Sequence, residues 1–253
     1  MIEKLFDINV PKHSIKCKLY CRDTRDIDGF VLYGHGFGGH RENGAAEKFA
    51  NKFISKTKKS AVLVFDLPAH GSDVKKIISL EDCNRYISIV VDYLNEKYDN
   101  PLINVYATSF GAYLFLKYIK ENPNPFGKMA FRCPALTMYD ATVEKIMVDR
   151  NFADLKKGKP TPVGFDRKVV LDRKFLDDIK KCDVAAMDFL DFAENMIIVH
   201  GEKDEIIPFR ASKAFAEENL IEFVPVKKGD HRFLNPDSMN EAISCIIRFL
   251  DMK

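Results

Sequence analysis

The sequence lacks a long apolar run and a large net charge, and each absence excludes a class of protein. No segment reaches about 18 consecutive apolar residues, so we expect no membrane-spanning helix and no partner membrane. The 39 basic and 37 acidic residues leave a net charge of +2, which favours neither nucleic acid nor an anionic surface. In residues 1–20 apolar and polar residues alternate, and charges stand where a signal peptide needs an apolar stretch. A cytoplasmic location is therefore expected.

Cofactor and metal motifs are also missing. The six cysteines form no CxxC pair and no clustered histidines accompany them, so we expect reduced, mostly buried thiols and no metal site. The glycines of "GHGFGG" (residues 34–39) are spaced as in a phosphate loop. No lysine followed by serine or threonine comes after them, so neither a phosphate cradle nor a dinucleotide cofactor is predicted.

Apolar runs of strand length alternate along the chain with stretches of helical spacing. The expected strands lie in residues 4–10, 14–21, 30–36, 60–67, 102–109, 127–134, 196–202 and 221–229. The expected helices span residues 42–56, 80–98, 110–122, 209–218 and 237–250. Because parallel crossovers need a helix-length connection, this order predicts an α/β fold with a mostly parallel eight-stranded sheet and helices on both faces.

One region interrupts this alternation. Between Pro134 and Glu194 no strong β run appears, glycine and proline cluster in residues 158–164, and charged residues are dense from 166 to 183. The region is too long for an ordinary connection. We therefore predict a core formed by residues 1–134 and 193–253, with residues 135–192 inserted after the sixth strand as a small cap.

Ser109 lies at the bend between an expected strand and an expected helix. Ala107 precedes it by two positions and Gly111 follows by two, and small residues there allow a tight turn that exposes the hydroxyl. Ligands gather at the carboxyl ends of parallel strands, where this bend would lie. The alternative is that Ser109 merely caps the following helix.

A nucleophilic serine needs a base and a carboxylate that orients it. His231 follows the last expected strand by a short loop, and Asp204 follows the strand that ends at Gly201. Glu202 and Glu205 compete with Asp204, which is preferred because a short carboxylate in mid-loop can reach back to a histidine ring. The other histidines are less well placed: His13, His35, His40, His70 and His200.

These pieces resemble the α/β-hydrolase superfamily, whose triad runs nucleophile, acid, histidine along the chain. The resemblance covers nearly the whole chain. The motifs that carry it each follow an expected strand: "HGFGGH", "DLPAHGSD", "ATSFG", "GEKDEIIP" and "GDHRF". The insert leading into "IIVHGEKDEIIP" further resembles the small cap of cinnamoyl and feruloyl esterases, a type of bacterial carboxylesterase.

The resemblance implies Ser109 as nucleophile, His231 as base and Asp204 as orienting acid. The backbone N–H groups of Phe37 and Phe110 would form the oxyanion hole. No metal or organic cofactor is implied.

The expected activity is hydrolysis of a small-molecule carboxylic ester, with aryl and hydroxycinnamoyl esters as candidates. A peptidase acting on short peptides and a non-catalytic ligand-binding protein stay open as alternatives, and a homo-oligomer is compatible with the sequence. Phe152, Phe165 and Phe175 of the insert would either line an aromatic-accepting pocket or pack the cap onto the core.

Overall fold

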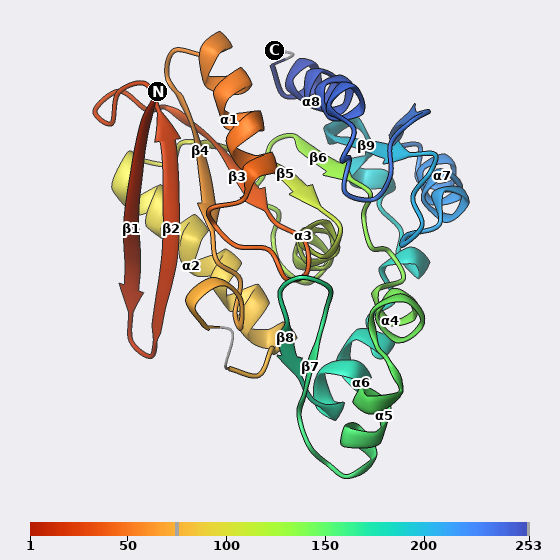
Figure 1. Ribbon diagram of the computed structural model, residues 1–253. Helices are drawn as coiled ribbons and strands as arrows, with labels where there is room; N and C mark the ends of the chain where they lie inside the picture. Colours follow the sequence, from red (N-terminus) through yellow and green to blue (C-terminus); the bar gives the residue numbers. More distant parts are fainter. Residues whose placement is uncertain (74–75, 252–253) are drawn as a thin grey trace.

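The computed structural model describes residues 1–73 and 76–251, and its centre is one large sheet (Figure 1). The strands are β1 (Ile2–Val10), β2 (His13–Cys21), β3 (Gly29–Gly34), β4 (Ser60–Phe65), β5 (Leu102–Thr108), β6 (Met129–Arg132), β7 (Thr161–Val163), β8 (Val169–Leu171), β9 (Met196–Gly201) and β10 (Glu222–Val226). Eight of them form the large sheet in the order β1-β2-β4-β3-β5-β6-β9-β10. All eight correspond to the strands expected from the sequence.

The pairing within the sheet is mostly parallel. The hairpin of β1 and β2 joins antiparallel to β4, and every neighbouring pair from β4 to β10 is parallel. The carboxyl ends of β5, β9 and β10 therefore lie at the same edge. The predicted α/β architecture with a mostly parallel eight-stranded sheet is confirmed.

Helices cover both faces of the sheet (Figure 1). The helices are α1 (Gly44–Lys56), α2 (Leu80–Tyr98), α3 (Phe110–Glu121), α4 (Met138–Asp140), α5 (Asp149–Lys156), α6 (Arg173–Lys181), α7 (Phe209–Glu218) and α8 (Pro236–Asp251), with short 3₁₀ or π segments η1 (Gly71–Asp73), η2 (Ala141–Ile146), η3 (Val184–Ala186) and η4 (Leu190–Asn195). α1 and α8 pack on one face, and α2, α3 and α7 on the other. The first helix begins two residues later than expected because the side chain of Asn43 accepts from Ala45 N–H and Ala46 N–H.

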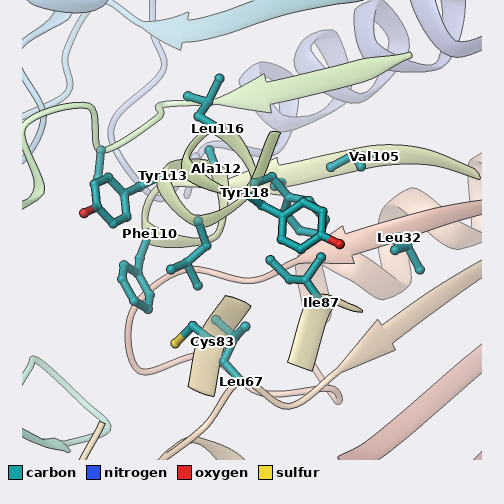
Figure 2. Close-up of a cluster of buried hydrophobic side chains, with 14 of the residues drawn as sticks. Leu32, Leu67, Cys83, Ile87, Val105, Phe110, Ala112, Tyr113, Leu116 and Tyr118 are labelled. Atoms are coloured by element: carbon teal, nitrogen blue, oxygen red, sulfur yellow. The ribbon is translucent and has the colours of Figure 1, made fainter. Parts of the chain in front are cut away.

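The apolar contacts under α2 and α3 fix the position of the β5–α3 turn. Figure 2 draws Leu32 from β3, Val105 from β5, Ile87 from α2 and Tyr118 from α3 as members of one buried cluster. Nearly every residue of α3 is buried, so the helix runs through the core and not over its surface. Its N-terminus is consequently held against the sheet edge.

The segment between β6 and β9 forms its own short elements. It holds α4, η2, α5, the antiparallel β7–β8 hairpin, α6, η3 and η4. Of these, α4, α5, α6, β7 and β8 lie below α3 in Figure 1. The sequence predicted little structure here and missed α6, whose Phe175, Leu176 and Ile179 are buried. That this segment divides from the core at residues 135–192 and acts as a cap stays a prediction.

Two further expectations concern the cysteines and the membrane. All six cysteines are free, with four buried and two half-buried, as predicted. No helix among residues 1–73 and 76–251 is long and apolar enough to cross a membrane.

Candidate active site

Ser109 lies between β5 and α3 with a backbone conformation that L-residues rarely adopt. Its φ is 51° and its ψ is −116°, and such strained positions cluster at functional sites. Gly111 makes the turn feasible, because a Cβ on this residue would lie 2.5 Å from the carbonyl oxygen of Gly34. The end of β3 and the start of α3 thus approach more closely than any side chain at position 111 would allow.

The hydroxyl of Ser109 does not cap the helix that follows. Although Ser109 occupies the N-cap position of α3, its side chain makes no capping hydrogen bond. Its Oγ lies 3.1 Å from Nε2 of His231, a residue 122 positions away in sequence. Of the two roles left open by the sequence, the geometry fits a hydroxyl presented to a histidine.

Asp204 lies on the other side of the His231 ring. Its Oδ2 is 2.8 Å from His231 Nδ1, and its Oδ1 accepts from the N–H groups of Ile206 and Ile207 at 2.9 and 2.7 Å. Burial alone would raise the pKa of the Asp204 carboxyl, but hydrogen bonds from two histidines and the backbone hold it well below its ordinary value. The ionised carboxylate accepts from Nδ1–H, which leaves Nε2 free to accept from Ser109.

The rival carboxylates lie elsewhere. Glu202 and Glu205 are exposed, and neither has a hydrogen bond to His231 within the described residues. Asp230, next to His231 in sequence, accepts from the N–H of Leu234 and so stabilises its own turn. The structure therefore brings together Ser109, His231 and Asp204, as the sequence predicted.

His200 is a partner of Asp204 that the sequence analysis did not identify. Its Nε2 lies 3.1 Å from the same Oδ2 that binds His231, and the ring is fully buried. The spacing of four residues between His200, at the end of β9, and Asp204 in the next loop was the available signal. The second imidazole therefore contacts the same carboxylate oxygen as His231.

The group of Cys133, His200 and Asp204 offers one ligand atom each within 4.8 Å of one another. Such side chains can bind a transition metal. Asp204 already accepts four hydrogen bonds, so a metal here would compete with His231 for the carboxylate. We assign no metal-binding role to this group.

The expected oxyanion donors flank Ser109. The N–H groups of Phe37 and Phe110 have no acceptor among the residues that the structure describes, and the two rings pack edge to face with centroids 5.5 Å apart. A Cβ built on Gly36 would lie 3.4 Å from the Cβ of Ser109, so the glycine loop passes directly beside the hydroxyl. Both unpaired donors therefore belong to segments that border Ser109.

Buried polar contacts hold that glycine loop in place. The carboxylate of Asp66 accepts from the backbone N–H of Arg41 and from its guanidinium, both at 2.6 Å. Leu67 N–H donates to Nε2 of His35, whose Nδ1–H then donates to Gly36 O at 3.0 Å. The loop after β3 is thus tied to the end of β4.

Two histidines beside this loop are held neutral. Burial lowers the pKa of His35 to about 4 and that of His70 to about 3. Their rings lie 5.2 Å apart, and His70 stacks on Phe110 at 6.2 Å. They act as packing groups under the site and do not contact the serine.

A cavity of about 720 Å³ opens in front of Ser109 and His231. Phe165 in the β7–β8 loop lines it and is about half exposed, whereas Phe175 is buried and packs edge to face on Phe110. Phe152 is partly exposed and lies outside the cavity lining. Only one of the three phenylalanines considered from the sequence therefore contacts the cavity.

The β7–β8 loop forms one wall of this cavity. Asp166 at its tip pairs with Arg232, the residue after His231, at 2.8 Å. A Cβ on Gly38 would lie 2.9 Å from the carbonyl oxygen of Arg167, so the loop also packs on the glycine loop. The segment between β6 and β9 therefore touches both loops that surround the serine.

Several solved structures share this fold at low sequence identity. A protein from Agrobacterium vitis S4 matches with a TM-score of 0.76 at 15% identity over 99% of both chains. Est1E from Butyrivibrio proteoclasticus, in a structure with bound ferulic acid, gives 0.74 at 18% identity over 97% of both chains. Alpha/beta hydrolase domain-containing protein 10 from mouse gives 0.69 at 15% identity over 98% of both chains.

No protein-family model matches the chain, and no curated protein sequence matches it significantly. The strand order and the likeness to these structures over nearly their whole length show the α/β-hydrolase fold, as the motifs predicted.

Proposed function

We propose that the protein is a serine hydrolase that cleaves a carboxylic ester through an acyl-enzyme intermediate. The observation that supports this most strongly is the hydrogen-bond chain from Ser109 Oγ through His231 to Asp204, at 3.1 and 2.8 Å. The fold supports the same conclusion, because its strand ends are where such triads are built.

In the first half-reaction Ser109 Oγ attacks the ester carbonyl carbon and its proton passes to His231 Nε2. Asp204 accepts from Nδ1–H throughout and stabilises the imidazolium that forms. The tetrahedral intermediate then collapses, the carbon–oxygen bond to the alcohol breaks, and the alcohol leaves with the proton from Nε2. The acyl group remains on Ser109.

The negative charge of the intermediate needs donors already in position. The N–H groups of Phe37 and Phe110 are unpaired next to Ser109, so they would bind the oxyanion without reorganising. Removing one such donor typically costs about 3 kcal/mol of transition-state stabilisation.

In the second half-reaction water replaces the alcohol. His231 Nε2 takes a proton from the water as its oxygen attacks the acyl carbon, and the carboxylic acid leaves as the bond to Ser109 Oγ breaks. Ser109 recovers its proton from His231. The chain's own residues supply every step, so the mechanism draws on no metal or organic cofactor.

For the substrate we favour an aryl or hydroxycinnamoyl ester. Phe37 and Phe165 line the cavity and offer ring surfaces to an aromatic group. Est1E, whose structure holds ferulic acid, is among the similar folds. Short peptides and a purely ligand-binding role are the competing outcomes of the test.

The proposal is tested by intact mass after incubation with a fluorophosphonate. Wild type should gain one adduct and Ser109→Ala none, while Ser55→Ala, at an exposed serine in α1, should react like wild type. Turnover of an aryl ester should fall on the order of 10⁴- to 10⁶-fold in Ser109→Ala. No adduct and no turnover on wild type would indicate the binding protein; faster cleavage of matched peptides than of esters would indicate the peptidase.

A further inference from the structure

Arg132 is a buried cation next to the nucleophile. It is the last residue of β6, its side chain is 5% exposed, and its carbonyl oxygen accepts from the N–H of Ser109 at 3.0 Å. It also lines the cavity that contains Ser109 and His231. The residue therefore belongs to the surroundings of the site, although the proposed chemistry does not use it.

The guanidinium of Arg132 forms no ion pair with a carboxylate among the described residues, although the half-buried Asp230 is near enough to help raise its pKa. Its contacts are the ring of Phe233, 5.1 Å away, and the sulfur of Met239, to which Nη1 donates at 3.1 Å. Its buried Nε has no hydrogen-bond acceptor. Within residues 1–73 and 76–251 no carboxylate oxygen lies within ion-pair distance of it.

An unpaired buried charge is unfavourable. Arginine stays protonated in proteins, and moving its charge out of water costs several kcal/mol unless an anion compensates. Its planar fork of N–H groups matches a carboxylate in a bidentate pair. A bound carboxylate would compensate the charge of Arg132.

The wall of the cavity beside α1 also carries a positive electrostatic potential, like Arg132. Asn43, Gly44 and Ala45 at the N-terminus of this 13-residue helix line the cavity, and a helix N-terminus carries a partial positive charge. This contribution is secondary, because Asn43 already caps the helix with its own side chain.

The acidic residues around the cavity are exposed. Glu42, Asp166 and Glu205 are all solvent-exposed, and Asp166 is paired with Arg232. Water and salt screen exposed charges far more than buried ones. They therefore neutralise Arg132 only weakly. Asp230 is half-buried and attracts the guanidinium, but its Oδ1 already accepts from the N–H of Leu234 and it makes no ion pair with Arg132.

Resting on the proposed function, we propose that the substrate is an ester that carries a carboxylate in its acyl or alcohol part, and that Arg132 binds this carboxylate. The planar fork of one guanidinium forms a bidentate pair with one carboxylate group, which is why we favour a carboxylate as the group that is bound. The substrate's ester carbonyl would lie at Ser109 while the anion neutralises Arg132.

The competing interpretation is structural. Arg132 could brace the loop after His231 through its contact with Phe233. If Arg132 is a brace, removing its guanidinium should lower stability and weaken the binding of neutral and anionic ligands equally. If it is an anion site, the removal should weaken only the binding of the charged member of a matched pair. The experiments below use such pairs.

Binding is measured first, by calorimetry with glutarate and its uncharged analogue glutaramide. Wild type and Ser109→Ala should bind glutarate at least about tenfold more tightly than glutaramide. Arg132→Met, which keeps the volume, should remove this preference, and Arg132→Lys should restore part of it. Arg167→Met is the control, because it removes an exposed cation from the same cavity and should change the preference less than about twofold.

Kinetics then compares two matched pairs of esters. The first is mono-4-nitrophenyl glutarate with its methyl ester, which places the charge in the acyl part. The second is 4-acetoxybenzoate with its methyl ester, which places it in the alcohol part. For wild type, kcat/KM of the anionic ester should exceed that of its methyl ester by at least about tenfold in at least one pair. In Arg132→Met the ratio of the two kcat/KM values should be close to 1.

The outcomes separate the two proposals. If Ser109→Ala binds glutarate selectively but wild type hydrolyses no ester, the anion site stands and the hydrolase does not. If esters are hydrolysed but wild type binds glutarate no better than glutaramide, the anion site is wrong; this comparison needs no variant and so survives a failure of Arg132→Met to fold. An equal preference in wild type and Arg132→Met likewise overturns it.

Discussion

The two sides of the cavity are built differently. On the core side Ser109, His231 and Asp204 follow parallel strands, and hydrogen bonds between largely buried groups fix them. On the other side the β7–β8 loop meets the core through Asp166 and Arg232, both largely exposed. On the proposed function, we expect the core to set the chemistry and the segment between β6 and β9 to set access. The following predictions test this division.

The largest effect should come from the buried carboxylate. Asp204→Asn leaves His231 without an anion to fix its tautomer, so kcat should fall on the order of 10³- to 10⁴-fold on any ester that wild type cleaves. The matched control is Glu202→Gln, an exposed carboxylate in the same loop, which should keep the wild-type rate. If both variants retain full turnover, the core side does not carry the chemistry.

Acidification should destabilise the core through its neutral histidines. Burial lowers the pKa of His35 to about 4 and that of His70 to about 3. Below about pH 6.5 these two histidines are therefore protonated in the unfolded chain but stay neutral in the folded protein. The free energy of unfolding should therefore decrease as the pH falls from about 6.5 toward 4.

Urea unfolding at several pH values checks this and assigns it to a residue. His70→Phe should reduce the slope between pH 4 and 6 by up to about 1.4 kcal/mol per pH unit, because one of the two protons is no longer taken up. An unchanged slope would show that His70 does not contribute.

Glycine at position 111 should be needed for the turn. In Gly111→Ala the new methyl group meets the carbonyl of Gly34, and overpacking of this kind costs about 1–3 kcal/mol. Gly44→Ala, also in the first turn of a helix, has open space around its Cβ and should be neutral or slightly stabilising. Equal unfolding midpoints in urea for the two variants would contradict this account of the bend.

The smallest effect should come from the exposed pair. Asp166→Asn should change the free energy of unfolding by less than about 1 kcal/mol, because water screens its interaction with Arg232. Any change in KM should be larger than the change in kcat, since the loop borders the cavity and does not contact Ser109. A loss of kcat comparable to that of Asp204→Asn would erase the distinction between the two sides.

The same contrast explains what the sequence could predict. β3 and β5 are short apolar runs bounded by glycine or serine. Near-continuous apolar runs are typical of strands that are buried in a parallel sheet. Their order alone indicated that Ser109, Asp204 and His231 would reach one edge. The structure places Ser109 Oγ and Asp204 Oδ2 on opposite nitrogens of the His231 ring.

The segment between β6 and β9 was harder to predict because its elements are short. β7 and β8 have three residues each, and their pairing depends on the loop between them and not on an apolar run. α6 did carry a signal: Asp172 caps it and three apolar residues share one face, but dense charges around them obscured the pattern. Arg132 was missed because nothing in the sequence shows which buried polar side chains lack a partner. For His200 the sequence offered only its spacing of four residues from Asp204.

The contact between Ser109 and His231 spans 122 positions, and Asp204 lies 27 positions before the histidine. During synthesis the serine and its turn therefore emerge long before either partner. Neither contact can form until β9 and β10 have joined the sheet beside β6. A nascent or truncated chain would hold an inert hydroxyl, so that, on the proposed mechanism, hydrolysis would be the last property to be acquired and a sensitive reporter of completed folding.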